Sequence, residues 1–135
     1  SIRTRESLRD TEQRIADLAL LGKQIDTYRK LKPVYDRYKA SKDKEKFLRG
    51  FESEIILFEA AAREIKKAGL TKLPSSDKVK AELEGLSARK AALQTELRKI
   101  QREEKEYDTL RQNVDALLER PKEQEQQRQR SNDLE

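Results

Sequence analysis

Four carboxylates near the start of the chain's last third are the first candidates for chemistry: Glu103, Glu104, Glu106 and Asp108. Carboxylate oxygens are the ligands that hard divalent cations prefer, so such a cluster could hold a cation. On a helix, however, successive side chains splay around the axis, and only Glu104 and Asp108 share a face. Three basic residues nearby offer ion pairs instead: Arg102, Lys105 and Arg111. We interpret the cluster as a solvated helix face and predict no metal site.

The chain lacks the residue types on which enzymes most often rely. The 135 residues contain neither Cys nor His, which excludes disulfides and thiolate chemistry and removes the commonest general base and metal ligand. The chain also contains no nucleophile–base pair and no glycine-rich phosphate loop. We therefore predict that this chain is not an enzyme, has no catalytic residue and binds no cofactor.

Basic residues offer a second kind of chemistry, the binding of phosphates. The net charge is +5, and residues 23–49 alone hold ten Lys or Arg against four Asp or Glu. Two interpretations stay open: a nucleic-acid interface, or a solvated face around a helical turn. On the first interpretation, the contacting residues are a set spaced by seven along one helix, together with three lysines at a junction that projects them outward: Lys23, Lys30, Arg37, Lys42, Lys44 and Lys46.

Tyr28 and Tyr35 alternate with these basic residues in sequence, an arrangement that could stack nucleic-acid bases. At about 100° per residue, however, both tyrosines point roughly opposite to the basic face, onto the apolar stripe of the same helix. We therefore predict that Tyr28 and Tyr35 pack in the core.

A seven-residue apolar repeat dominates the second half of the chain. Its members are Val79, Leu86, Leu93, Ile100, Tyr107 and Val114. Leucines at spacings of three and four fill in beside them: Leu83, Leu97, Leu110, Leu117 and Leu118. A repeat held this long keeps one stripe of a helix facing a partner helix, so we expect these residues, Tyr107 included, to be buried.

The same patterns predict three helices, at about residues 2–40, 44–68 and 76–119. The first is expected to kink near Pro33. Ser41 or Asp43 is a candidate cap for the second, Gly69 should end it, and Ser75 or Ser76 should cap the third. The second is expected to be the most buried, with an apolar face widened by Leu48 and Ile56.

The fold class predicted is all-α. The two long helices form an antiparallel, coiled-coil-like pair, and the shorter middle helix packs at one end as the third member of a bundle spanning residues 1–119. The start of the first helix would then face the end of the third. In the competing arrangement, an up-down-up bundle, the end of the third helix overhangs and a dimer partner covers it.

Residues 120–135 are expected to form a disordered tail, because no residue from Glu119 to Asp133 is apolar. No apolar run approaches a membrane span and no signal-peptide pattern occurs, so we expect a cytoplasmic protein without a membrane partner. Met is absent, even at position 1, which suggests a fragment or a processed product.

Short strings in a fixed order resemble the C-terminal helical region of relaxase/mobilization nucleases from conjugative and mobilizable elements. The strings are Val34-Tyr35 with Tyr38, Lys46-Phe47-Leu48, Glu54-Ile55, Ala60-Ala61 with Arg63, Lys72-Leu73-Pro74, and Asn113-Val114-Asp115 with Leu117-Leu118. The resemblance covers roughly residues 8–118. The Leu-Pro connector and the closing Asn-Val-Asp are its most specific elements.

In that family, an N-terminal domain with a catalytic Tyr and a His-rich metal site nicks the DNA. No catalytic residue carries over, because this chain has no His. The resemblance implies a non-catalytic appendage that assists the binding of DNA or of relaxosome and transfer proteins. The alternative is a structural or protein-interaction coiled coil with no nucleic-acid role, with a homodimer as one form.

Overall fold

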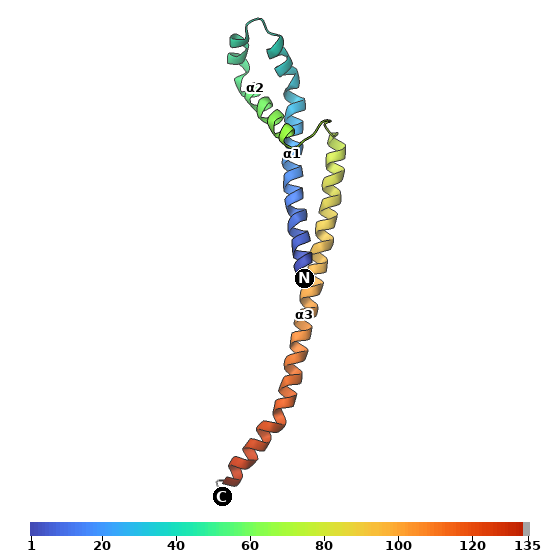
Figure 1. Ribbon diagram of the computed structural model, residues 1–135, viewed down its shortest axis with the longest axis vertical. Helices are drawn as coiled ribbons and strands as arrows, with labels where there is room; N and C mark the ends of the chain where they lie inside the picture. The colour runs from blue at the N-terminus through green and yellow to red at the C-terminus, as the bar shows by residue number, and fades with distance from the viewer. Residues whose placement is uncertain (134–135) are drawn as a thin grey trace.

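Three helices make up the protein in a computed structural model, which describes the backbone of residues 1–133 and the side chains of residues 1–119 and 130. Helix α1 spans Ile2–Ala40, α2 spans Lys44–Lys67 and α3 spans Ser76–Asp133. Figure 1 shows α1 and α2 as a hairpin, and α3 as a long rod that runs antiparallel to α1 and continues past its start. No strand occurs in the described backbone. The predicted all-α class is confirmed.

Aromatic rings join α1 to α2. The ring of Phe58 stacks between Tyr28 and Tyr35, at centroid distances of 4.7 and 4.3 Å. Nearer the turn, Phe47 stacks on Phe51 at 4.7 Å, and Tyr38 lies 6.1 Å from Phe47. Stacked rings bury large apolar areas in a narrow contact, which suits a two-helix hairpin. As predicted, Tyr28 and Tyr35 pack on the core through the buried Phe58, and both rings are half-buried.

The most buried side chains lie next to these rings, mainly on the side away from the α1–α2 turn. Ile25 of α1 is 1% exposed, and α2 contributes four buried side chains, more than either long helix: Ile55, Phe58, Ala61 and Ile65. This confirms that α2 is the most buried helix. Ile56, in contrast, was expected on the buried face and is 54% exposed, because α2 packs on α1 alone and its flank has no neighbour among the described residues.

The pairing of α1 with α3 is fixed by two close approaches. A Cβ placed on Gly22 would lie 3.2 Å from a methyl of Val79, and Glu12 forms an ion pair with Lys90 at 3.9 Å. Residue numbers fall along α1 as they rise along α3, so the helices are antiparallel. In this register the first turn of α1 lies level with Ile100.

Helix α3 therefore extends beyond the end of α1, and every described side chain of residues 101–119 is exposed. We call this stretch the overhang. Tyr107 is 65% exposed, which corrects its predicted burial. The expectation that the start of α1 faces the end of α3 is also wrong. The apolar pattern specifies a face but not the helix that covers it, and among the described residues α1 begins level with Ile100.

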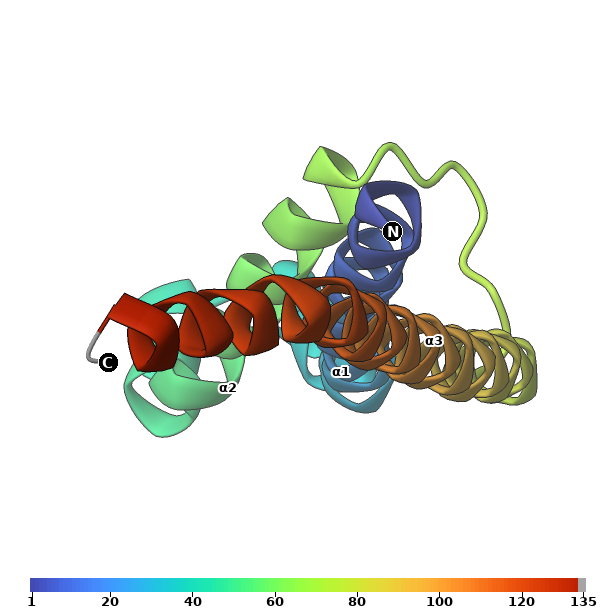
Figure 2. The same ribbon diagram turned by 90° about the horizontal axis from the view of Figure 1, so that it is seen from below.

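Local signals set the helix ends as expected. The Asp43 carboxylate accepts a hydrogen bond from the Lys46 amide at 3.1 Å, and the Ser75 hydroxyl accepts one from the Lys78 amide at 3.1 Å. Gly69 follows α2 with a φ of 73°, the left-handed conformation that terminates helices. Figure 2 shows the connection after it as an open arc from the end of α2 to the start of α3.

Two helix details differ from expectation. Helix α1 continues through Pro33, as its predicted range of about 2–40 requires, whereas α2 has unexpected non-helical backbone angles at Phe51 (φ −134°, ψ 28°). Helix α3 continues past the expected end near Glu119 to Asp133, in a segment rich in the good helix formers Glu, Gln, Arg and Lys. A disordered tail was predicted for residues 120–135. Of their side chains the structure describes only that of Arg130, so the disorder stays a prediction.

Candidate nucleic-acid interface

The six predicted nucleic-acid contacts all have exposed side chains. Lys23, Lys30 and Arg37 lie along α1, while Lys42 lies in the α1–α2 turn and Lys44 and Lys46 lie in the first turn of α2. The fourteen residues from Lys23 to Arg37 correspond to about 21 Å of helix. The structure thus brings four of the six together at the end of the hairpin, with Lys23 and Lys30 farther down α1.

Two further basic residues belong to this end of the molecule, Lys39 and Arg49, and both are exposed. We define the basic tip as Arg37, Lys39, Lys42, Lys44, Lys46 and Arg49. Against these six positive charges, residues 37–49 contain two negative ones, Asp43 and Glu45. Spacing by seven did not single out Lys39 and Arg49. The raw charge excess over residues 23–49 already included them and was the better signal.

Contacts within the hairpin orient part of the basic tip. The Arg37 guanidinium lies over the rings of Phe47 and Phe51, 5.6 and 5.7 Å from their centroids, and the Lys39 ammonium lies 5.4 Å from the ring of Tyr35. Such contacts hold the stem of a cationic side chain while leaving its charge unneutralised. The aromatic rings of the hairpin therefore already contact one another and these cations, so they offer no free face on which a nucleic-acid base could stack.

Ion pairs of the described residues fall outside the basic tip. Lys32 donates to the Asp36 carboxylate at 3.1 Å, while the others join Lys67 to Glu64 and Lys90 to Glu12. The hydrogen bond to Asp36, with its charge, raises the pKa of Lys32 above the ordinary lysine value. Lys32 thus has a local counter-charge, whereas no ion pair of the described residues involves a lysine of the basic tip.

Lys44 and Lys46 occupy an electrostatically unfavourable place. They lie in the first turn of α2, where the unpaired amides of the helix carry partial positive charge. Acidic residues stabilise this position, and lysines oppose it by about 0.3–1 kcal/mol each at low salt. Asp43 and Glu45 supply the favourable charge at the same helix start. The two lysines therefore do not stabilise the fold, although an approaching anion would be attracted by both the lysines and the helix end.

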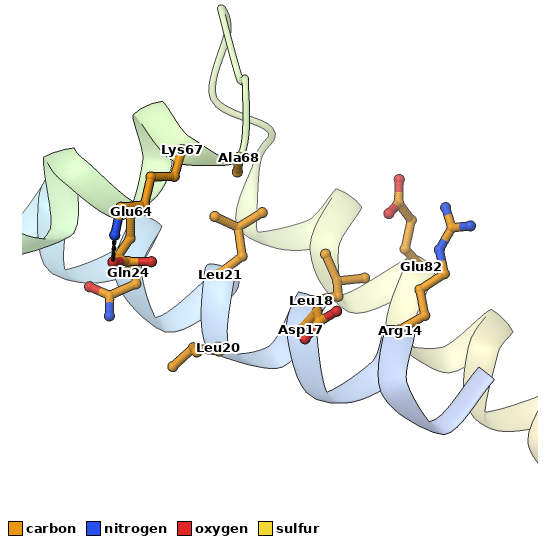
Figure 3. A pocket seen from close by; sticks show the side chains of 10 residues that line it. All are labelled: Arg14, Asp17, Leu18, Leu20, Leu21, Gln24, Glu64, Lys67, Ala68 and Glu82. Atoms are coloured by element: carbon orange, nitrogen blue, oxygen red, sulfur yellow. Dashed lines mark hydrogen bonds and ion pairs between the residues drawn. The ribbon is translucent and has the colours of Figure 1, made fainter. Parts of the chain in front are cut away.

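A shallow groove of about 420 Å³ lies where α1 meets the end of α2 and the first turns of α3. Figure 3 shows apolar side chains of α1, Leu18 and Leu21, between charged residues on its rim. Glu64 and Lys67 on that rim are paired with each other at 3.4 Å. The groove offers no nucleophile beside a base and no convergent set of ligands.

The described residues lack two further kinds of feature. They contain no group of three or more acidic residues arranged to hold a metal ion, the cluster around Glu104 included. Among them, no helix combines the length and the apolar character needed to cross a bilayer.

Comparisons with known proteins identify no relative. No protein-family model, no curated protein and no solved structure matches the chain.

Proposed function

We propose that this chain is a non-catalytic helical accessory domain of a relaxase-like DNA-mobilization protein, and that it contacts DNA phosphates through the basic tip. The observation that carries the proposal is the placement of Lys44 and Lys46. They are exposed, lie outside the ion pairs of the described residues and stand at a helix start that they disfavour. Lysines that lower the stability of a helix start are expected to have another role, and binding a ligand of opposite charge is such a role. DNA as the partner also gives the cytoplasm as the expected compartment.

The expected binding is weak and largely independent of sequence. Lysines and arginines contact phosphates without reading base edges, and the tip presents no strand or free helix face that could enter a groove. Three or four phosphate contacts predict that affinity falls about 40- to 150-fold between 50 and 200 mM salt, through loss of counterion release.

Fluorescence anisotropy with labelled single- and double-stranded oligonucleotides tests this proposal. The triple variant Lys42→Glu, Lys44→Glu, Lys46→Glu should lose at least about tenfold in affinity and most of the salt dependence. The matched control is Lys72→Glu, Lys80→Glu, Arg89→Glu, which changes the net charge equally at exposed positions away from the tip. Thermal stability of the first triple should hold or rise, because glutamates suit a helix start.

Equal loss in both triple variants would mean that net charge alone attracts DNA, and would refute the tip as an interface. Unchanged affinity in the tip variant would refute it as well.

A second candidate function is a structural or protein-interaction coiled coil whose charges serve solubility only. The exposed apolar face of the overhang favours it, because such a face is typical of helices that pack on another protein. Absence of DNA binding in low salt, together with association of the chain with itself or with transfer proteins, would select this function over the first.

The relaxase assignment has its own test, in the coding sequence upstream of Ser1. A preceding domain with clustered His and an N-terminal Tyr is the expected result. An upstream domain without them would leave a helical module of another DNA-binding or scaffolding protein.

A further inference from the structure

The overhang presents a continuous apolar face to solvent. Tyr107, Leu110, Val114 and Leu117 recur at spacings of three and four, and 46% to 65% of each side chain is exposed, with Leu118 beside them. Elsewhere on α3 the same repeat is covered by α1, as Val79 is beside Gly22. Large apolar side chains aligned over two heptads mark an interaction surface rather than ordinary solvent exposure.

Helix α1 cannot cover this face, because it begins level with Ile100 and runs the other way (Figure 1). Helix α2 packs at the opposite end of α1 and makes no contact with α3 in the described part of the chain. The described residues therefore leave this face open to a further helix. We propose that this helix is the overhang of a second copy, paired in parallel as a short two-stranded coiled coil.

Charge complementarity supports a second copy. In heptad positions a to g, with Tyr107 and Val114 at a, Glu106 occupies g and Arg111 the following e. In parallel dimers a g residue faces the e residue five positions later on the other helix, so Glu106 of each copy faces Arg111 of the other. Both side chains are exposed and outside the ion pairs of the described residues.

The apolar positions support the parallel direction. Val114 is β-branched at a, and Leu110 and Leu117 occupy d, the combination that favours parallel two-stranded coiled coils. An antiparallel pair that matched Tyr107 with Leu117 and Leu110 with Val114 would instead place Arg111 of one copy against Arg111 of the other. Charge and shape therefore favour the same direction.

The size of the contact predicts weak association. Two heptads make a small interface, and Glu103 at the preceding d position would face its own copy, so the contact begins after it. We expect a dissociation constant on the order of 100 μM, with an isologous two-fold dimer in which the two α1–α2 hairpins diverge from a common stalk. The proposal is independent of DNA binding, because the basic tip and the overhang share no residue.

Sedimentation equilibrium of the full 135-residue chain tests the proposal. Mass should rise from monomer to dimer between about 10 μM and 1 mM. Glu106→Arg alone and Arg111→Glu alone should each weaken association at least about fivefold through like charges across the contact. The double variant Glu106→Arg, Arg111→Glu should restore it, which no effect on the isolated helix would do.

Direction is tested with a single cysteine, since the chain has none of its own. Tyr107→Cys should form an intermolecular disulfide under mild oxidation, because a parallel pair sets the two positions 107 side by side. In the antiparallel pair they would lie about 15 Å apart along the helix. A chain that stays monomeric at 1 mM, a double charge variant that fails to recover, or an absence of the disulfide would each overturn the proposal.

Discussion

Both halves of α3 have apolar residues at seven-residue intervals, but these side chains are covered in one half and exposed in the other. Residues 76–100 lie against α1, where Val79 is buried beside Gly22, whereas in the overhang Tyr107, Leu110 and Leu117 are mostly exposed. The seven-residue positions alone do not distinguish the halves, although their apolar companions shift from four residues on, at Leu83 and Leu97, to three residues on, at Leu110 and Leu117. In the described residues, the pairing with α1 stops near Ile100, where α1 begins. A heptad repeat therefore reports that a helix needs a partner, and the partner must be found separately.

The largest expected difference between packed and unpacked regions comes from truncating one large side chain in each. Phe58→Ala should destabilise the protein by about 3–5 kcal/mol, because Phe58 is 6% exposed and its ring stacks on both Tyr28 and Tyr35. Leu117→Ala should cost less than about 0.5 kcal/mol where the chain is monomeric. Urea denaturation at low micromolar concentration measures both. Similar losses would mean that the overhang is covered within the monomer.

Two glycines sharpen the comparison within the α1–α3 pair. Gly22→Leu should destabilise by about 1–3 kcal/mol, because a Cβ there already lies 3.2 Å from a Val79 methyl. Gly85→Leu is the matched control: nothing lies within 4 Å of its Cβ, and replacing a helical glycine should stabilise by up to about 1 kcal/mol.

Thermal denaturation compares the two glycine variants, and Val79→Ala in the Gly22→Leu background should recover part of the loss. Tolerance of Gly22→Leu without that second change would show that the register of α1 on α3 is wrong.

The smallest effect concerns the connection between α2 and α3. The Arg29 guanidinium donates to the carbonyl oxygens of Pro74 at 2.6 Å and of Leu73 at 3.4 Å. Arg29→Ala should cost about 0.5–1.5 kcal/mol and speed amide exchange at 70–75, since these bonds attach the connection to α1. Arg9→Ala, an exposed α1 position outside the described side-chain hydrogen bonds, is the control. Equal exchange in the two variants would contradict a role for Arg29.

Local chemistry made the helix bounds on either side of the two connections predictable. Asp43 and Ser75 act within three residues of themselves, and Gly69 needs only its own backbone freedom, so short windows of sequence contain the whole cause. The antiparallel pairing of α1 with α3 and the place of α2 also follow from complementary apolar faces. The exposure of Tyr107 and Ile56 does not, because it depends on which surfaces the other helices fail to reach.

The candidate interface shows the same division. Exposure of Lys23, Lys30 and Arg37 follows from their positions opposite the apolar stripe, and exposure of the other three basic residues follows from their place at the junction between two helices. The packing of Tyr28 and Tyr35 follows from their positions on the stripe itself. The gathering of Lys39 and Arg49 with the others depends on how the hairpin closes around Phe47, a tertiary contact that spacing along one helix does not encode.

The reach of α3 has a mechanical consequence. A helix of 58 residues is about 87 Å long, many times the roughly 8 Å over which charges act in physiological salt. A polyanion held at one end of the molecule and a protein held far along this rod would not feel each other's fields. Any coupling between them would arise from tethering alone, so that the chain would work as a spacer whose two attachments strengthen each other only by proximity.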